Sequence, residues 1–133
     1  MHEILHPKHW KPARGYSNGV AAEGRMVFTG GIIGWNAEQA FETDDFVGQV
    51  EQALKSIVEI LAEAGAGPEH LVRLTWYVTD KREYLDGLKE LGAVYKAVIG
   101  RNYPAMALVQ VVALVEDRAK VEIEATAVIP EAM

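Results

Sequence analysis

The chain has 133 residues, of which 50% are hydrophobic and 24% charged, so it is the size of one domain and has enough apolar material for a core. Its formal net charge is -6 and its lysines and arginines are scattered, which argues against a nucleic-acid partner, because polyanion binding needs concentrated positive charge. Since the chain has no cysteine, disulfides, thiolate metal sites and cysteine nucleophiles are excluded.

The N-terminal segment, residues 1–14, is rich in His, Lys and Pro and has no apolar centre, so it is not expected to be a secretory signal. We interpret it as an N-terminal extension of a single domain that spans residues 1–133. No apolar run approaches the ~20 residues that a membrane-spanning helix needs. These features predict a cytoplasmic protein that has no membrane partner.

Three histidines of this segment have a spacing that would bring two imidazoles together on a helical turn: His2, His6 and His9. Pro7 and Pro12 disfavour such a helix, because proline lacks the backbone N–H and clashes with the preceding turn. We therefore expect no metal site.

Two apolar runs flank the turn signal Glu23-Gly24 and predict an antiparallel hairpin of strands 17–22 and 26–33. A glycine-rich stretch, residues 30–34, lies at the end of the second strand. Glycine there allows either a β-bulge or the close approach of another group to the backbone. The stretch lacks the lysine and the following helix of a phosphate-binding loop, so no nucleotide cofactor is expected.

The segment Thr43-Asp44-Asp45 predicts the start of a helix, because acidic side chains there cap backbone N–H groups and face the positive end of the helix dipole. Hydrophobic residues then recur every three or four positions as far as Ala64. Polar residues, Gln49 among them, are expected on the opposite face. Gly65 and the pair Gly67-Pro68 are expected to end the helix.

Residues 71–79 alternate between apolar and polar side chains, which predicts a strand. Asp80, with Glu83 three residues later, predicts a capping box at the start of a second helix. That helix carries one apolar stripe and is expected to end near Gly100.

The last two strands are predicted at residues 107–114 and 120–129. The order of elements predicts an α+β fold, with a mixed sheet and both helices on one of its faces. Two helices cannot cover both faces, so we expect the chain to associate through the sheet. The apolar strand residues behind this expectation are Val109, Val111, Val121, Ile123, Ala125 and Ala127.

Six short motifs occur in order along most of the chain. They are Gly15-Tyr16-Ser17-Asn18-Gly19-Val20, Phe28-Thr29-Gly30-Gly31, Ala62-Glu63-Ala64-Gly65, Val78-Thr79-Asp80, Tyr103-Pro104-Ala105 and Val121-Glu122-Ile123-Glu124-Ala125. In the order and spacing of these motifs the chain resembles the RidA/YjgF family. The resemblance implies a chorismate-mutase-like fold and a homotrimer whose sheets form a central barrel. It also implies three small-molecule clefts between the subunits.

Members of the best-known branch of this family hydrolyse reactive enamines and imines, such as 2-aminoacrylate, to a keto acid and ammonia. Position by position, the resemblance places Tyr16, the backbone of Gly31 and Glu122 in the ligand cleft. Glu122 is the candidate catalytic residue, because a carboxylate can orient the attacking water and pass a proton. Strand alternation by itself also fits a solvated or subunit-facing position for Glu122.

The family's substrate-binding arginine should follow Pro104-Ala105, where this chain has Met106, and a family asparagine corresponds to Gly92. Losing one half of an arginine–carboxylate pair in a sheltered site costs ~2–5 kcal/mol, or roughly thirty- to several-thousand-fold in affinity. We therefore expect 2-aminoacrylate to be a poor substrate. The ligand should be more apolar, or held by another cation, Arg14 or Arg101.

Trp35 and Tyr103 are predicted to wall the same cleft, since aromatic surfaces suit a planar, conjugated ligand; packing in the core or an interface is the alternative for both. Ala105, beside Met106, completes the candidate ligand-binding set. Two other functions stay open. One is a trimer that binds a small metabolite without turning it over, and the other is a nuclease, an activity attached to relatives of this fold but disfavoured here by the acidic charge.

Overall fold

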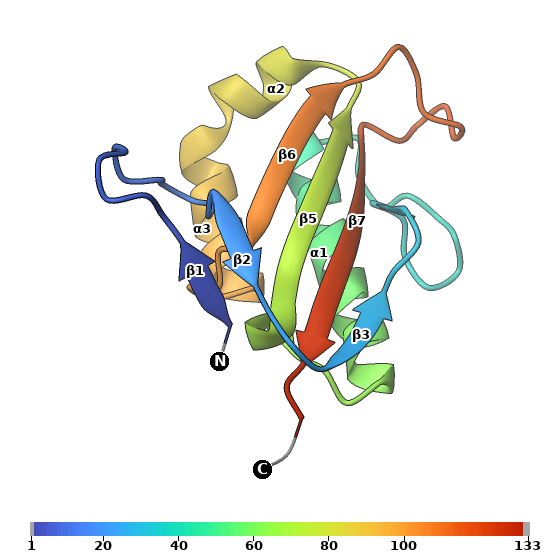
Figure 1. Cartoon of the computed structure of the whole chain (residues 1–133). Coiled ribbons are helices and arrows are strands. Elements are labelled where there is room, and N and C mark those ends of the chain that lie inside the picture. Colours follow the sequence, from blue (N-terminus) through green and yellow to red (C-terminus); the bar gives the residue numbers. More distant parts are fainter. Residues whose placement is uncertain (1, 132–133) are drawn as a thin grey trace.

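The computed structural model describes residues 2–131. A five-stranded sheet runs in the order β3-β7-β5-β6, and the short β4 also pairs with β7. Two helices, α1 and α3, cover one face of this sheet, and the other face is open (Figure 1). The predicted α+β architecture, with a mixed sheet and its helices on a single face, is confirmed. The sheet strands are β3 (Arg25–Phe28), β4 (Ile32–Ile33), β5 (Leu71–Val78), β6 (Ala105–Gln110) and β7 (Val121–Ile129).

The remaining elements are two more strands and four helical segments. β5 and β6 run parallel, whereas β7 is antiparallel to its neighbours β3, β4 and β5. The other elements are β1 (Glu3–Leu5), β2 (Gly19–Ala21), α1 (Phe46–Glu63), the 3₁₀ segment η1 (Pro68–His70), α2 (Lys81–Asp86) and α3 (Leu88–Val98).

The predicted hairpin of residues 17–22 and 26–33 is wrong. β2 pairs with β1 in a separate two-stranded sheet, and β3 pairs with β7 instead. At the turn, Gly24 has φ +143°, and a Cβ there would lie 2.0 Å from the carbonyl oxygen of Ile129. The chain therefore passes against the end of β7, which offers a long antiparallel edge, rather than folding back on β2. Within the expected N-terminal extension, residues 3–5 form β1.

The first helix begins where it was predicted. The Asp45 side chain accepts a hydrogen bond from the Gly48 N–H at 2.9 Å and so caps α1. The apolar face of α1 packs on the sheet and buries Leu54, Ile57 and Leu61 completely. The next residue but one after the helix, Gly65, has φ +78°, the left-handed conformation that commonly ends helices.

The apolar residues of the last strand, on which the expected association through the sheet partly rested, are already covered by the helices of the same chain. Alternate residues of β7 lie in the core under α1, because a strand with one buried face turns its apolar set toward the helix layer. β6 ends at Gln110, short of the predicted 114, and Val112 in the following loop is fully exposed. The buried β7 residues are Val121, Ile123, Ala125 and Ala127.

The expected position of Gln49 on the polar face of α1 is also wrong, because this side chain is buried. Its amide nitrogen donates to the carbonyl oxygens of Thr43 and Arg118 at 3.1 and 3.0 Å. Its amide oxygen accepts from the Lys120 N–H at 2.8 Å. Gln49 therefore satisfies three backbone groups and ties the start of α1 to the start of β7.

Replacing Gln49 by leucine should lower the free energy of unfolding by about 2–5 kcal/mol, because leucine leaves three partly buried backbone groups without their partners. Chemical denaturation of the variant and the parent measures this loss. Gln52→Leu is the matched control, since Gln52 lies one turn further along α1 and its amide bonds only the Ser56 hydroxyl. We expect the control to change stability by less than about 1 kcal/mol. Equal stability of the two leucine variants would contradict this role of Gln49.

The second helix is capped only in part as predicted. The Asp80 side chain accepts from the Arg82 N–H at 2.9 Å, but the Glu83 carboxylate does not return to the cap. Instead it accepts from Lys120 Nζ at 3.1 Å, an ion pair that reaches the start of β7. The predicted single helix is divided at Gly87 into α2 and α3.

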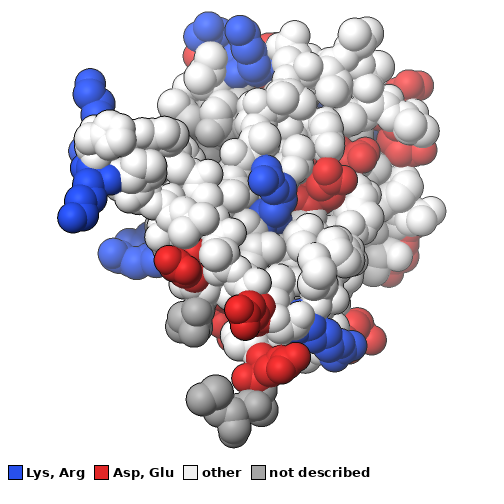
Figure 2. All heavy atoms as spheres, viewed as in Figure 1, with Lys and Arg blue, Asp and Glu red and all other residues white. Residues whose placement is uncertain are grey.

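The open face of the sheet carries polar and apolar side chains in a mixture. Strand alternation places Tyr77 of β5 and both Glu122 and Glu124 of β7 on this face. At its edge, Met26 and Phe28 of β3 are 58% and 64% exposed. Figure 2 shows that most of this face is uncharged, with basic and acidic side chains next to each other near its middle. Among the helices of residues 2–131, none has the length and apolar character to cross a membrane.

Candidate functional site

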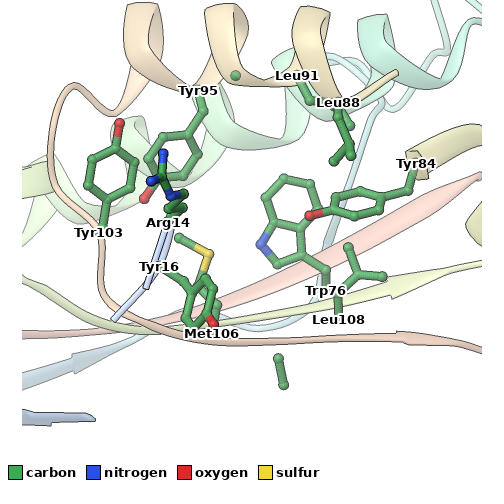
Figure 3. Close-up of a pocket in the computed structure, with 13 residues that line it drawn as sticks. Arg14, Tyr16, Trp76, Tyr84, Leu88, Leu91, Tyr95, Tyr103, Met106 and Leu108 are labelled. Carbon is green, nitrogen blue, oxygen red and sulfur yellow. The ribbon is translucent and has the colours of Figure 1, made fainter. Parts of the chain in front are cut away.

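A pocket of about 410 Å³ opens on the helix side of β6. It lies between that strand, α2, α3 and the segment that precedes β2 (Figure 3). We call it the aromatic pocket, because five of its lining residues are aromatic. The lining residues are Arg14, Gly15, Tyr16, Trp76, Tyr84, Leu88, Leu91, Gly92, Tyr95, Tyr103, Met106, Ala107 and Leu108.

Tyr16 is held at the pocket by backbone contacts of the next residue. The Ser17 N–H donates to the carbonyl oxygen of Pro104 at 3.0 Å, and its hydroxyl donates to that of Tyr103. Ser17 also forms an isolated parallel bridge with Ala105, which is buried and does not line the pocket. The chain before β2 therefore lies along the start of β6 and places Tyr16 beside the pocket.

Two aromatic pairs form the walls of the pocket. The rings of Tyr95 and Tyr103 are stacked, with centroids 5.5 Å apart and planes 12° apart. The rings of Trp76 and Tyr84 meet edge to face at 6.2 Å. Both arrangements are favourable geometries for aromatic pairs and leave flat apolar surface for a ligand. Burial, with a further contribution from Tyr103, raises the pKa of Tyr95, so its phenol stays neutral.

Arg14 is the charged residue of the aromatic pocket. Figure 3 shows its side chain at the end formed by Tyr95 and Tyr103, whereas Trp76 and Tyr84 lie at the other end. Within the described chain, no acidic residue lines the pocket. The local charge therefore favours an anionic or electron-rich ligand over a cation.

Met106, at the position of the family's arginine, points into this pocket. On β6 it pairs with the buried Leu74 of β5, so both side chains face the helices. Gly92 on α3 lines the pocket as well, and a Cβ at this position would meet no atom within 4 Å. The two positions at which a polar family residue was expected therefore both face the pocket, but neither supplies a polar side chain.

Sequence reasoning did not assign Trp76, Tyr84 and Tyr95 to the site. Period two placed Trp76 among the core residues of β5, and the helical stripe did the same for the two tyrosines. The available signal was the polar atom that each of these side chains carries. A buried indole or phenol needs a hydrogen-bond partner, whereas a position with only a packing role is usually aliphatic.

A second cluster lies on the open face of the sheet, where Glu122 of β7 meets Gly31. A Cβ at Gly31 would lie 2.1 Å from Glu122 Oε2, so a larger residue here would force this carboxylate to move. Residues 29–31 stand opposite only two residues of β7, which is a β-bulge. Thr29 fixes the bulge: its hydroxyl accepts from the Ala125 N–H at 3.0 Å and donates to the Gly30 carbonyl at 2.8 Å.

Gly31→Ala should displace the Glu122 carboxylate and reduce any activity that depends on it by about tenfold or more, because small misplacements of a catalytic group cost up to about a hundredfold. Gly30→Ala is the matched control, since a Cβ at Gly30 would meet nothing within 4 Å. Steady-state rates on the imines described below measure both variants. Equal rates for the two alanine variants would show that this contact is of no consequence.

The same face holds a hydrogen bond between Tyr77 and Glu124. The Tyr77 hydroxyl donates to Glu124 Oε1 at 2.9 Å, and this bond raises the pKa of Tyr77, with burial and the negative charges of both glutamates adding to the effect. Glu124 is therefore engaged with a neutral phenol, whereas Glu122, one pleat away, faces the glycine-rich bulge.

In a single chain the two clusters do not meet. Glu122 lies on the open face and Met106 on the helix face, and β5 separates their strands. Trp35 belongs to neither cluster: its ring lies 5.9 Å from that of Phe41. Arg101 is exposed and does not line the aromatic pocket, whereas Arg14 does.

Two of the three N-terminal histidines lie within hydrogen-bond distance of backbone carbonyl oxygens. His2 Nε2 lies 3.0 Å from the carbonyl oxygen of His70, and His6 Nε2 lies 3.1 Å from that of Trp10. Across residues 2–131, no three His, Asp or Glu side chains are grouped so that they could hold a metal ion.

Comparison with known proteins places the chain in a family. The family model described as Endoribonuclease L-PSP matches residues 7–129. A RutC family protein of Aquifex aeolicus is 38% identical over 96 residues, which are 72% of this chain and 73% of that protein. The human 2-iminobutanoate/2-iminopropanoate deaminase is 31% identical, with 85% of this chain and 79% of the human protein covered.

The fold comparison agrees with the sequence comparison. The crystal structure of YyfB, a Rid-family protein of unknown function from Yersinia pestis, superposes with a TM-score of 0.83 at 30% identity. The match covers 96% of this chain and 98% of that one. The sequence motifs, the fold and these matches all point to the same family over nearly the whole length of the chain. The chain belongs to the RidA/YjgF family.

Proposed function

We propose that this protein is a hydrolytic deaminase that converts an enamine or imine to a carbonyl compound and ammonia. The active site would lie between subunits of a homotrimer, with the aromatic pocket of one copy facing the Gly31–Glu122 cluster of the next. The observation that supports the proposal is the close packing of the Glu122 carboxylate against Gly31, where a Cβ would lie 2.1 Å from Oε2. It holds a carboxylate on the open face of the sheet, and the exposed apolar residues Met26 and Phe28 at the edge of this face suit it to association.

The chemistry needs few groups. Water attacks the carbon of the C=N bond, and the carboxylate of Glu122 orients this water and accepts its proton. The proton then passes to the nitrogen. As the C–N bond of the tetrahedral adduct breaks, the hydroxyl proton also moves to the nitrogen, which gives the carbonyl compound and ammonia; an enamine first tautomerises to the imine. Water and imine are consumed, carbonyl compound and ammonia are formed, and no cofactor is required for the balance.

The substrate should differ from 2-aminoacrylate. Met106 offers a flexible apolar surface where a guanidinium would bind a carboxylate, and the pocket volume lies within the range of sites that hold whole small molecules. Arg14 is the candidate cation for an anionic ligand, because it lines the pocket. Aromatic or branched imines fit this combination of one cation and apolar walls.

The test supplies two imines to the parent protein. One is the imine tautomer of 2-aminoacrylate, which is itself an enamine, and the other is the aromatic imine that an amino-acid oxidase forms from phenylalanine. Both are followed by the appearance of oxo acid and ammonia. We expect acceleration over the spontaneous rate that is clear for the aromatic imine and weak for 2-aminoacrylate. Acceleration of neither imine would contradict the proposed activity. Acceleration of 2-aminoacrylate to the level of an arginine-bearing relative would contradict the substrate preference.

A non-catalytic metabolite-binding trimer is the second candidate function. The absence of polar side chains at Met106 and Gly92 favours it, since both positions line the pocket. Glu122→Ala separates the two functions: an enzyme loses turnover by orders of magnitude as a folded trimer, whereas a binding protein changes only its affinity.

A further inference from the structure

One polar atom at the aromatic pocket has no hydrogen-bond partner within the fold, and a packing role alone does not explain its presence. Trp76 is 6% exposed, and its indole Nε1 is the one buried side-chain nitrogen or oxygen in residues 2–131 that has no hydrogen-bond partner. A buried donor without a partner destabilises a fold, and native proteins nearly always satisfy such groups. A position with only a packing role would therefore be expected to carry a phenylalanine or an aliphatic residue.

The unpaired N–H is directed at the place where a ligand would lie. In Figure 3 the nitrogen edge of the Trp76 indole faces the interior of the pocket, toward Met106 and Tyr16, while the ring meets Tyr84 edge to face. Trp76 pairs with Leu108 on β6, two residues after Met106, so the indole and the methionine line neighbouring positions of one surface. Methionine has three rotatable bonds and can move aside for an incoming group.

We infer that the Trp76 indole N–H recognises an acceptor oxygen of the ligand. Together with Arg14, it selects a planar anion with an aromatic or branched apolar body. The inference rests on the proposed function for the identity of the site, and it names the residue that determines specificity. An aromatic-walled pocket can also hold a cation. Here the Arg14 guanidinium and the Trp76 N–H, which points its positive end into the pocket, both disfavour a cationic ligand.

Phenylpyruvate is a suitable probe, because it combines an aromatic ring with carbonyl and carboxylate acceptors. In Trp76→Phe the aromatic wall remains and the donor is lost. We expect phenylpyruvate to bind this variant about ten- to thirtyfold more weakly than the parent, the loss of one hydrogen bond to a charged or carbonyl oxygen. Propylbenzene, which has the apolar body without an acceptor, should bind both proteins within about twofold. Trp35→Phe, the same replacement outside the pocket, should leave the phenylpyruvate affinity unchanged.

A second measurement does not depend on the folding of the variant. In ¹⁵N-labelled parent protein, phenylpyruvate should shift the Trp76 indole N–H resonance downfield, with Trp10→Phe and Trp35→Phe assigning the other two indole signals. An unmoved Trp76 signal at saturation, or equal phenylpyruvate affinity of Trp76→Phe and parent, would overturn the inference. Neither readout requires turnover. If phenylpyruvate binds through Trp76 but no imine is hydrolysed, only the deaminase proposal is contradicted. If imines are hydrolysed at a rate that Trp76→Phe does not change and phenylpyruvate does not contact Trp76, only this inference is contradicted.

Discussion

Glu122→Gln is expected to lower kcat for imine hydrolysis by roughly 10²–10⁴-fold, the usual contribution of a positioned general base. Glutamine keeps the volume of the side chain beside Gly31 but cannot accept a proton from the attacking water. Because Glu122 lies on the open face of the sheet and not in the core, the variant should fold and assemble as the parent does. Initial rates of oxo-acid formation at saturating imine measure the effect.

Glu124→Gln is the matched control for this prediction. Glu124 occupies the same strand and the same face, and its carboxylate accepts from Tyr77 rather than contacting the glycine-rich bulge. We expect kcat of this variant to stay within about threefold of the parent, since a glutamine oxygen can still accept from the phenol. If Glu122→Gln retained the parental rate, or if both variants lost it equally, Glu122 would not be the catalytic residue.

Met106→Arg is expected to raise kcat/KM for 2-aminoacrylate by roughly thirty- to several-thousand-fold, the value of an arginine–carboxylate pair in a sheltered site. The side chain at this position is half-buried and lines the aromatic pocket, so a guanidinium there would reach a ligand carboxylate. The same change should weaken the use of aromatic imines, because arginine fills apolar space that the ring would occupy.

The matching control places the same residue elsewhere. Ile60 is 37% exposed on α1 and does not line the pocket, so Ile60→Arg should leave the relative rates on the two imines as they are in the parent. A folded Met106→Arg protein whose preference also stays unchanged would show that the pocket does not bind the substrate carboxylate.

Local signals accounted for the first helix of this fold and for the start of the second. The first helix was readable because its cap at Asp45, its period and its glycine stop are all encoded within a few residues of each other. The hairpin of residues 17–22 and 26–33 failed for the opposite reason. A turn signal at Gly24 specifies a bend, but the partner of β3 is β7, about a hundred residues away along the chain, and no local pattern identifies a long-range partner.

The buried amide of Gln49 illustrates another limit. A polar residue in an amphipathic helix is normally assigned to the solvent, yet here it satisfies backbone groups of two other segments. These backbone groups become neighbours of Gln49 only after the chain has folded, so no residue spacing in the sequence predicts the contacts.

The site could be predicted only in part, because some of its features depend on contacts that form only when the chain folds. The family motifs named Tyr16, Gly31, Met106 and Glu122, and the structure puts two of these in the pocket and two on the other face of the sheet. The role of Trp76 depends on an unpaired donor, and hydrogen-bond satisfaction is a property of coordinates rather than of residue type.

A subunit-mixing experiment tests most directly whether the two clusters act together across a seam between copies. Glu122→Gln removes the proposed base, and Gly92→Trp plugs the pocket from α3, where an added side chain meets no neighbouring atom within 4 Å at its Cβ. Each variant alone should be inactive. When subunits of the two variants are exchanged, some interfaces combine an open pocket from one copy with an intact Glu122 from the next, and these should be active. Random exchange in a closed ring produces this combination at a quarter of the interfaces, so about a quarter of the parental rate is expected. Mixed trimers, verified by mass spectrometry against the 14.6 kDa chain, that remain inactive would contradict the shared site.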